Sequence, residues 1–155
     1  MSLENLFNRL EKEGKLKKQH TGMDYLNGLL NAANRNFQAS SANLNLYEET
    51  AFKAAYDGLL QISRVLVLMH GYRPDDGSQH KTTFEVAAAI LGKDFNAILS
   101  KIDRYRIQRN NCIYDPKILI TGTEAKNILN TAKEYWHVVK AYLKSKNPQL
   151  ELFDF

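Results

Sequence analysis

The chain has one cysteine, Cys112, among its 155 residues. A single thiol excludes an internal disulfide and every metal motif that needs several cysteines. The sequence also lacks an apolar run approaching the roughly 20 residues that span a bilayer, and its N-terminus has no signal-peptide core. We therefore expect a cytoplasmic protein with no membrane partner, no metal site and no cofactor.

Proline is also scarce, with three residues at positions 74, 116 and 148. Each lies between periodic segments, which is typical of a helical protein. A hydrophobic content of 44% and a formal charge of +4 describe a globular, mildly basic chain. Such a charge fits an RNA or acidic-protein partner but is too small for a dedicated nucleic-acid binder. We predict one all-α domain over residues 1–146 and a tail over 147–155.

Apolar residues recur at spacings of three and four in six segments, each of which is predicted to be a helix. The expected helices are Leu3–Lys12, one that follows the candidate cap Thr21, Leu46–His70, Gln79–Leu91, Asp94–Ile113, and one that follows the capping box Thr121–Glu124. We expect a turn at 73–77. Four substantial helices with short connections predict a bundle.

The helix expected over 94–113 carries charge on its apolar face. Its stripe runs through Phe95, Ile98, Ile102 and Tyr105 and then reaches Arg109 and Cys112. A buried arginine is costly unless it is paired. Arg109 is therefore expected to form an ion pair at the end of the bundle or to bind a phosphate in a dimer cleft. The candidate carboxylate partners are Asp103, Asp115 and Glu124, and Arg104 and Arg106 are candidate members of a basic rim for RNA phosphates.

Several motifs follow one another in a recognisable order. A long helix ends in Gly71-Tyr72-Arg73-Pro74, His80 opens the next helix, and Arg109-Asn110 precedes Tyr114 and a capped final helix. Over about Leu46 to Leu143 this order resembles the HEPN superfamily. The resemblance implies a four-helix up-and-down bundle, here with one or two extra N-terminal helices, that forms a homodimer and works beside a nucleotidyltransferase-type partner protein. Many members of that superfamily are metal-independent ribonucleases that act as toxins.

The resemblance also implies site residues. The HEPN motif is an arginine, a polar residue and then a histidine, and Arg109 and Asn110 match its first two positions. Tyr114 stands where the histidine belongs, and a phenol with a reference pKa near 10 is a poorer base than an imidazole near 6.5. His80 should point inward from its helix. We expect it either to reach Arg109 or to hydrogen-bond a backbone carbonyl or an acidic side chain in the core.

Two function hypotheses follow. The leading one is a HEPN-like dimer that acts as an interaction or RNA/nucleotide-binding component of a two-component, toxin-antitoxin-like system. The alternative is a metal-independent ribonuclease toxin that uses Arg109 and Asn110, with Tyr114 in place of histidine and His80 as a candidate second group.

The tail carries a further motif. Gln149, Leu150, Leu152 and Phe153 resemble the short peptide with which many bacterial proteins bind the DNA-polymerase sliding clamp. Exposed apolar residues at a chain end need a pocket. The pocket is expected on the clamp, on this protein's own bundle or on its dimer mate.

Overall fold

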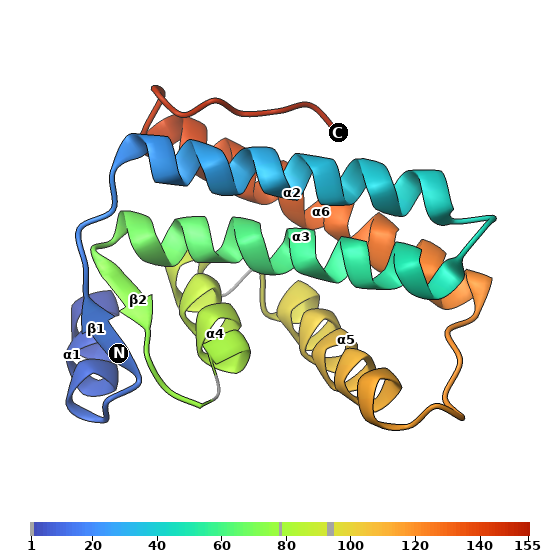
Figure 1. The fold of residues 1–155 in the computed structure, drawn as a ribbon. Helices are drawn as coiled ribbons and strands as arrows, with labels where there is room; N and C mark the ends of the chain where they lie inside the picture. Colours follow the sequence, from blue (N-terminus) through green and yellow to red (C-terminus); the bar gives the residue numbers. More distant parts are fainter. Residues whose placement is uncertain (1, 78, 93–94) are drawn as a thin grey trace.

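The structure, a computed structural model, describes residues 2–77, 79–92 and 95–155. Within them it contains six helices and two short strands (Figure 1). In chain order the elements are α1 (Leu3–Lys12), β1 (Leu16–Lys18), α2 (Met23–Asn43), α3 (Glu48–Met69), β2 (Tyr72–Pro74), α4 (Gln79–Leu91), α5 (Asn96–Tyr114) and α6 (Gly122–Lys146). The prediction of a mostly helical protein is confirmed.

Local signals set several helix ends as expected. The bounds of α1 and α4 are those predicted. At the start of α6 the Thr121 hydroxyl accepts from the Glu124 amide and the Glu124 carboxylate accepts from the Thr121 amide, so the predicted capping box is confirmed. The predicted Thr21 cap is wrong, because Gly22 is the N-cap of α2 and no side chain caps that end. The predicted start of the fifth helix at Asp94 lies outside the described residues.

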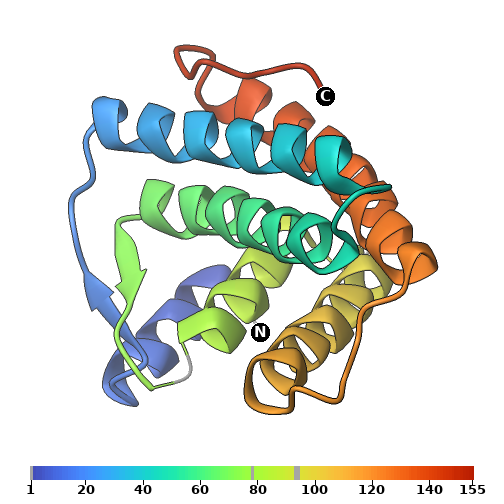
Figure 2. The same cartoon turned by 45° about the vertical axis from the view of Figure 1, so that its right-hand side comes forward.

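Helix α3 is the centre of the fold. It packs against α2, α4, α5 and α6, so it is covered on most sides. Figures 1 and 2 show α2 and α6 along one side of α3, while α4 and α5 cross its other side obliquely. The predicted four-helix up-and-down bundle is therefore not confirmed, although the helices do share one core.

The two strands correct the prediction of a purely helical chain with a turn at 73–77. Leu16 pairs with Pro74 and Lys18 with Tyr72 in an antiparallel ladder. Pro74 lacks an amide proton, which suits it to the end of a strand. Three-residue strands have almost no periodic signal, and these two are far apart in the sequence. Their pairing was therefore not visible in the local pattern.

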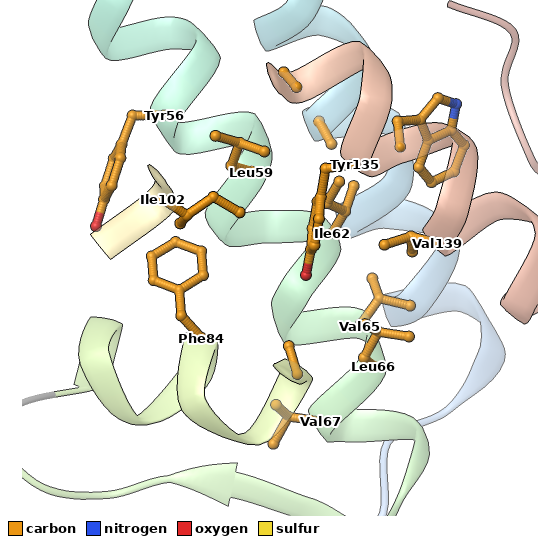
Figure 3. Close-up of a cluster of buried hydrophobic side chains, with 14 of the residues drawn as sticks. Tyr56, Leu59, Ile62, Val65, Leu66, Val67, Phe84, Ile102, Tyr135 and Val139 are labelled. Atoms are coloured by element: carbon orange, nitrogen blue, oxygen red, sulfur yellow. The ribbon is translucent and has the colours of Figure 1, made fainter. Parts of the chain in front are cut away.

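The core lies between α3 and its neighbours (Figure 3). Leu59, Ile62 and Leu66 of α3 are fully buried beside Tyr135 and Val139 of α6. The Tyr135 hydroxyl lies 2.8 Å from the Ser63 hydroxyl, which in turn donates to the Leu59 carbonyl. This satisfied polar pair fixes the register of α6 on α3. The predicted stripe of α5 is confirmed by the burial of Ile98 and Ile102.

The tail packs on the domain from which it emerges. Leu150 is buried, and the Phe153 ring stacks on Trp136 of α6 with centroids 4.1 Å apart. The Trp136 indole donates to the Phe153 carbonyl at 3.1 Å, and the Glu151 amide donates to the Asn27 side chain of α2 at 2.9 Å. Of the three pockets considered for these residues, the structure shows the protein's own, between α2 and α6.

Among the described helices, none has a stretch both long enough and apolar enough to pass through a bilayer.

Candidate functional site

Three helices bring polar residues together on the side of α3 away from α2. Tyr56 comes from the middle of α3, His80 from the first turn of α4 and Arg109 from the last third of α5. Beside them is a pocket of about 570 Å³ that opens to solvent. It is lined by Asp76 and Gly77 before α4, by Gln79, His80 and Lys81 of α4, and by Arg106, Arg109 and Asn110 of α5.

Arg109 lies half-buried against Tyr56. Its guanidinium carbon is 5.3 Å from the centroid of the Tyr56 ring, within range of a cation–π contact. Its Nε is buried and has no hydrogen-bond partner in the described part of the chain. A buried donor without a partner is uncommon and needs a physical reason, such as a ligand that supplies the acceptor.

The predicted ion pair of Arg109 is not formed within the described residues. All three candidate carboxylates are used elsewhere. Asp103 pairs with Arg106 at 3.0 Å, Asp115 accepts from the Lys117 amide, and Glu124 completes the capping box of α6. Of the two alternatives for Arg109, the ion pair with one of these three carboxylates is therefore not formed, and the phosphate-binding alternative stays a prediction.

His80 does reach the neighbourhood of Arg109. Its Nδ1 lies 3.0 Å from the Tyr56 hydroxyl, so its partner is a phenol where a carbonyl or an acid was expected. Burial, together with the positive charges of Arg109 and Arg64, lowers the pKa of the His80 imidazole. The ring is therefore favoured in its neutral form.

Asp57 is a neighbour of the site that the sequence gave no reason to select. It follows Tyr56 on α3 and is half-buried. Burial raises the pKa of its carboxyl group, and Arg109 opposes that rise. No ion pair joins Asp57 to Arg109 among the described residues, so the carboxylate acts on the guanidinium only through space.

The other two arginines occupy different surroundings. Arg106 lines the pocket, but its Nε is held by Asp103 one turn earlier. Arg104 is exposed and lines a separate hollow with Phe84 and Leu99. The structure thus brings Arg106 and Arg109 to one pocket and places Arg104 outside it, so the predicted rim of three arginines is not assembled.

Tyr114 is not part of the pocket. It is the last residue of α5 and its side chain is 84% exposed. Five residues advance a helix by about 500°, so Tyr114 lies roughly 140° around α5 from Arg109. Asn110, by contrast, does line the pocket. Within one chain, His80 and not Tyr114 lines the pocket beside Arg109.

Tyr56 is a member of the site that the sequence gave no reason to select. Its ring is fully buried, and it also packs edge-on against Phe84. No sequence signal separates a tyrosine whose hydroxyl serves a site from one that only fills the core. Lys81 and Asp76 were missed for the same reason, because only the fold places them beside α5.

The donors at this pocket suit an anion. The side chains of Lys81, Arg106 and Arg109 are cationic, whereas Asp76 is the one acid among the described lining residues, and it already accepts from Thr82 at 3.0 Å. No cluster of three or more metal-ligating side chains occurs in the chain as described. Comparison of the sequence and structure with known protein families, with curated proteins and with solved structures finds no match.

Proposed function

We propose that this chain is an RNA-binding component of a two-component system and that the pocket at Arg109 receives a phosphate of the RNA. The proposal keeps the HEPN-like interpretation of the sequence, with a homodimer and a nucleotidyltransferase-type partner. It departs from the HEPN motif in using His80, and not Tyr114, beside Arg109.

The observation that carries the proposal is the buried Arg109 Nε with no partner in the described part of the chain. The buried Nε beside Tyr56 loses its hydration, and no acceptor in the described part of the chain replaces that water. A phosphate oxygen supplies that acceptor in the planar geometry that arginine favours. When the anion binds, it gives the buried Nε the hydrogen-bond acceptor that it lacks, and the recovered desolvation free energy contributes to the binding affinity.

The start of α4 adds to the attraction. Gln79, His80 and Lys81 form its first turn, where backbone amides have no helical acceptor and the helix dipole is positive. Cationic side chains and the first turn of a helix therefore border the same pocket. This combination favours an oxyanion and gives no preference for a particular base, so we expect binding that follows the RNA backbone.

Fluorescence anisotropy with a labelled random-sequence single-stranded RNA tests the proposal. Arg109→Gln removes the guanidinium, and Arg35→Gln on α2 removes an exposed arginine outside the pocket. Losing a charged hydrogen bond should weaken binding about tenfold or more. Arg109→Gln should also lower the salt dependence. Equal affinity of the two variants would mean that the pocket does not hold the phosphate.

A ribonuclease is the second candidate, because His80 and Arg109 line the same pocket. In that reaction the imidazole takes the proton of a ribose 2′-hydroxyl and the arginine stabilises the charge that develops on the phosphate. The test is incubation with RNA in the presence of EDTA. Cleavage that is lost in both His80→Gln and Arg109→Gln, with growth arrest on expression of the unmodified chain, would establish the toxin.

For the homodimer, the supporting observation is that large apolar side chains at and after the end of α5 are exposed. Tyr114 ends α5, and Leu119 in the following connection is 76% exposed. Large exposed apolar residues that lie close together mark interaction surfaces. Sedimentation velocity checks this: Tyr114→Ser with Leu119→Ser should shift a dimer to monomer, whereas Lys126→Ser on α6 should not.

The protein's own α2 and α6 already bind the tail residues that a sliding clamp would need. Leu150 is buried, and Phe153 is stacked on Trp136. A clamp would have to release both anchors before it could bind them. We therefore rank this function below the two that use the pocket.

A further inference from the structure

The proton of the Tyr56 hydroxyl has one acceptor available. The Tyr56 side chain is fully buried, and its oxygen lies 3.0 Å from Nδ1 of His80. Within residues 2–77, 79–92 and 95–155, this hydroxyl makes no other hydrogen bond. A buried O–H without an acceptor is strongly disfavoured, so the phenol donates to Nδ1. Burial also raises the pKa of the phenol, which keeps that proton in place.

Donation from Tyr56 decides which ring nitrogen of His80 carries the proton. A neutral imidazole has one N–H and one acceptor nitrogen. When Nδ1 accepts from Tyr56, the proton is on Nε2. That nitrogen has no hydrogen bond in the described part of the chain and is open to solvent at the pocket.

The charges around His80 hold the ring neutral. From α3 it faces Tyr56 and Arg64, from α5 Arg106 and Arg109. On its own side of the pocket Lys81 follows it and Asp76 precedes α4, but the Asp76 carboxylate is bonded to Thr82. Protonation would add a charge beside three arginines, and Nδ1–H would then donate to the Tyr56 oxygen, which would leave the buried phenol O–H without an acceptor.

We infer that Tyr56 holds His80 as a neutral imidazole with its proton on Nε2, so that His80 donates a hydrogen bond to the bound phosphate and is not available as a general base. The identity of the acceptor rests on the proposed function, whereas the tautomer does not. Tyr56 thereby positions both recognition groups, because its ring also lies under the Arg109 guanidinium.

The consequence separates the two candidate functions. A general base needs a free lone pair at the reacting site, and in this arrangement the lone pair of His80 faces Tyr56. The nitrogen that faces the pocket is a donor. The arrangement therefore suits binding of a phosphate and opposes proton abstraction from a 2′-hydroxyl.

The first measurement is the tautomer itself, in the full chain without RNA. Imidazole ¹⁵N shifts of histidine-labelled protein at neutral pH distinguish a protonated from an unprotonated ring nitrogen, and loss of one set of signals in His80→Gln assigns His80. We expect an unprotonated Nδ1 and a protonated Nε2. A proton on Nδ1, or a doubly protonated ring, would overturn the inference whether or not the protein binds RNA.

The second measurement uses amide side chains that imitate one edge of the ring. A glutamine amide reaches the place of Nε2–H, whereas an asparagine amide reaches only that of Nδ1. His80→Gln should therefore retain most of the RNA affinity, and His80→Asn should lose it about tenfold. Unchanged affinity in both variants, with the ¹⁵N result as expected, would mean that His80 does not contact the phosphate, and an equal loss in both would mean that Nε2–H is not the group that binds it.

Tyr56→Phe removes only the hydroxyl and keeps the ring beneath Arg109. It should shift protonation of His80 toward Nδ1 and weaken RNA binding. Tyr135→Phe is the matched control, since it removes another fully buried hydroxyl, bonded to Ser63, away from the pocket. That control should leave the His80 signals unchanged. If Tyr56→Phe also leaves them unchanged, the hydroxyl does not set the tautomer; if the unmodified chain fails to bind RNA while the tautomer is as expected, only the proposed function fails.

Discussion

The ring of Phe153 in the tail lies parallel to the indole of Trp136, with an interplanar angle of 5°. The same residue accepts a hydrogen bond from that indole through its backbone carbonyl. Two residues further on, Phe155 stacks on Phe37 of α2 with centroids 5.0 Å apart. The last residues of the chain therefore join α2 to α6, and removing their contacts should lower the stability of the whole domain.

Phe153→Ala should lower the free energy of unfolding by about 1–2 kcal/mol, because it deletes a stacked and partly buried ring. Trp136 is the only tryptophan of the chain, so urea unfolding followed by its fluorescence reports on this contact directly. The emission of the folded variant should shift to the red. Leu46→Ala, at an exposed site between α2 and α3, is the control; a Phe153→Ala curve that overlays it would show that the tail is not attached in solution.

Gly58 and Gly28 form a matched pair for close helix packing. A Cβ on Gly58 of α3 would lie 2.4 Å from the Phe37 ring of α2, whereas one on Gly28 of α2 meets nothing within 4 Å. Gly58→Ala should therefore destabilise the fold by about 1–3 kcal/mol through overpacking. Gly28→Ala should stabilise it by up to about 1 kcal/mol through helix propensity. Thermal unfolding by circular dichroism compares them, and a stabilised Gly58→Ala would contradict the close approach of α2 and α3.

Asp57→Asn tests the effect of the half-buried Asp57 carboxylate on stability and on the neighbouring Arg109 guanidinium. Burial raises the pKa of this carboxyl, so its charged form is disfavoured in the folded state and the aspartate costs stability at neutral pH. This destabilisation by the charged Asp57 carboxylate is absent below the pKa of the unfolded state, near 3.9. It grows as the pH rises through the higher pKa of the folded state. The variant should be more stable at pH 7, by at most about 1 kcal/mol because the carboxylate is only half-buried.

The advantage of Asp57→Asn should disappear in acid, which urea unfolding at several pH values would show. The variant should also bind RNA more tightly, since a negative charge near Arg109 is gone. Glu134→Gln at an exposed position of α6 controls for a change of net charge alone. Weaker RNA binding by Asp57→Asn would indicate that the carboxylate orients the guanidinium.

His80 should make stability depend on pH in the opposite direction. Burial and the nearby arginines lower the pKa of its imidazole, so the folded state binds a proton less readily than the unfolded chain. The contribution of neutral His80 to the free energy of unfolding is complete above the pKa of the unfolded state, near 6.5. It is lost as the pH falls toward the lower pKa of the folded state. The slope should approach at most about 1.4 kcal/mol per pH unit.

His80→Gln should flatten this part of the stability curve between neutral and mildly acidic pH. His137→Gln removes an exposed imidazole from α6 and should retain the slope of the unmodified chain. Chemical unfolding at a series of pH values measures both. Identical slopes for the two variants would place His80 in a more solvated environment than the structure gives it.

The sequence by itself determined where most helices lie and what ends them. The spacing of Ile98, Ile102 and Tyr105 predicted the buried face of α5, and Thr121 with Glu124 predicted the start of α6. These signals are local, because helical periodicity and capping join residues three or four positions apart. The presence of Arg109 on an otherwise apolar stripe also pointed to the candidate site.

Only the tertiary structure decided which residues stand beside Arg109. It brought Tyr56 and His80 to the guanidinium from two other helices, turned Tyr114 into solvent, and placed the candidate carboxylates in other bonds. It also paired β1 with β2 and folded the tail onto Trp136. Each of these contacts joins segments distant in the chain. They depend on how the helices pack around α3. The period of apolar residues shows which face of a helix is buried, but it does not show which other segment that face contacts.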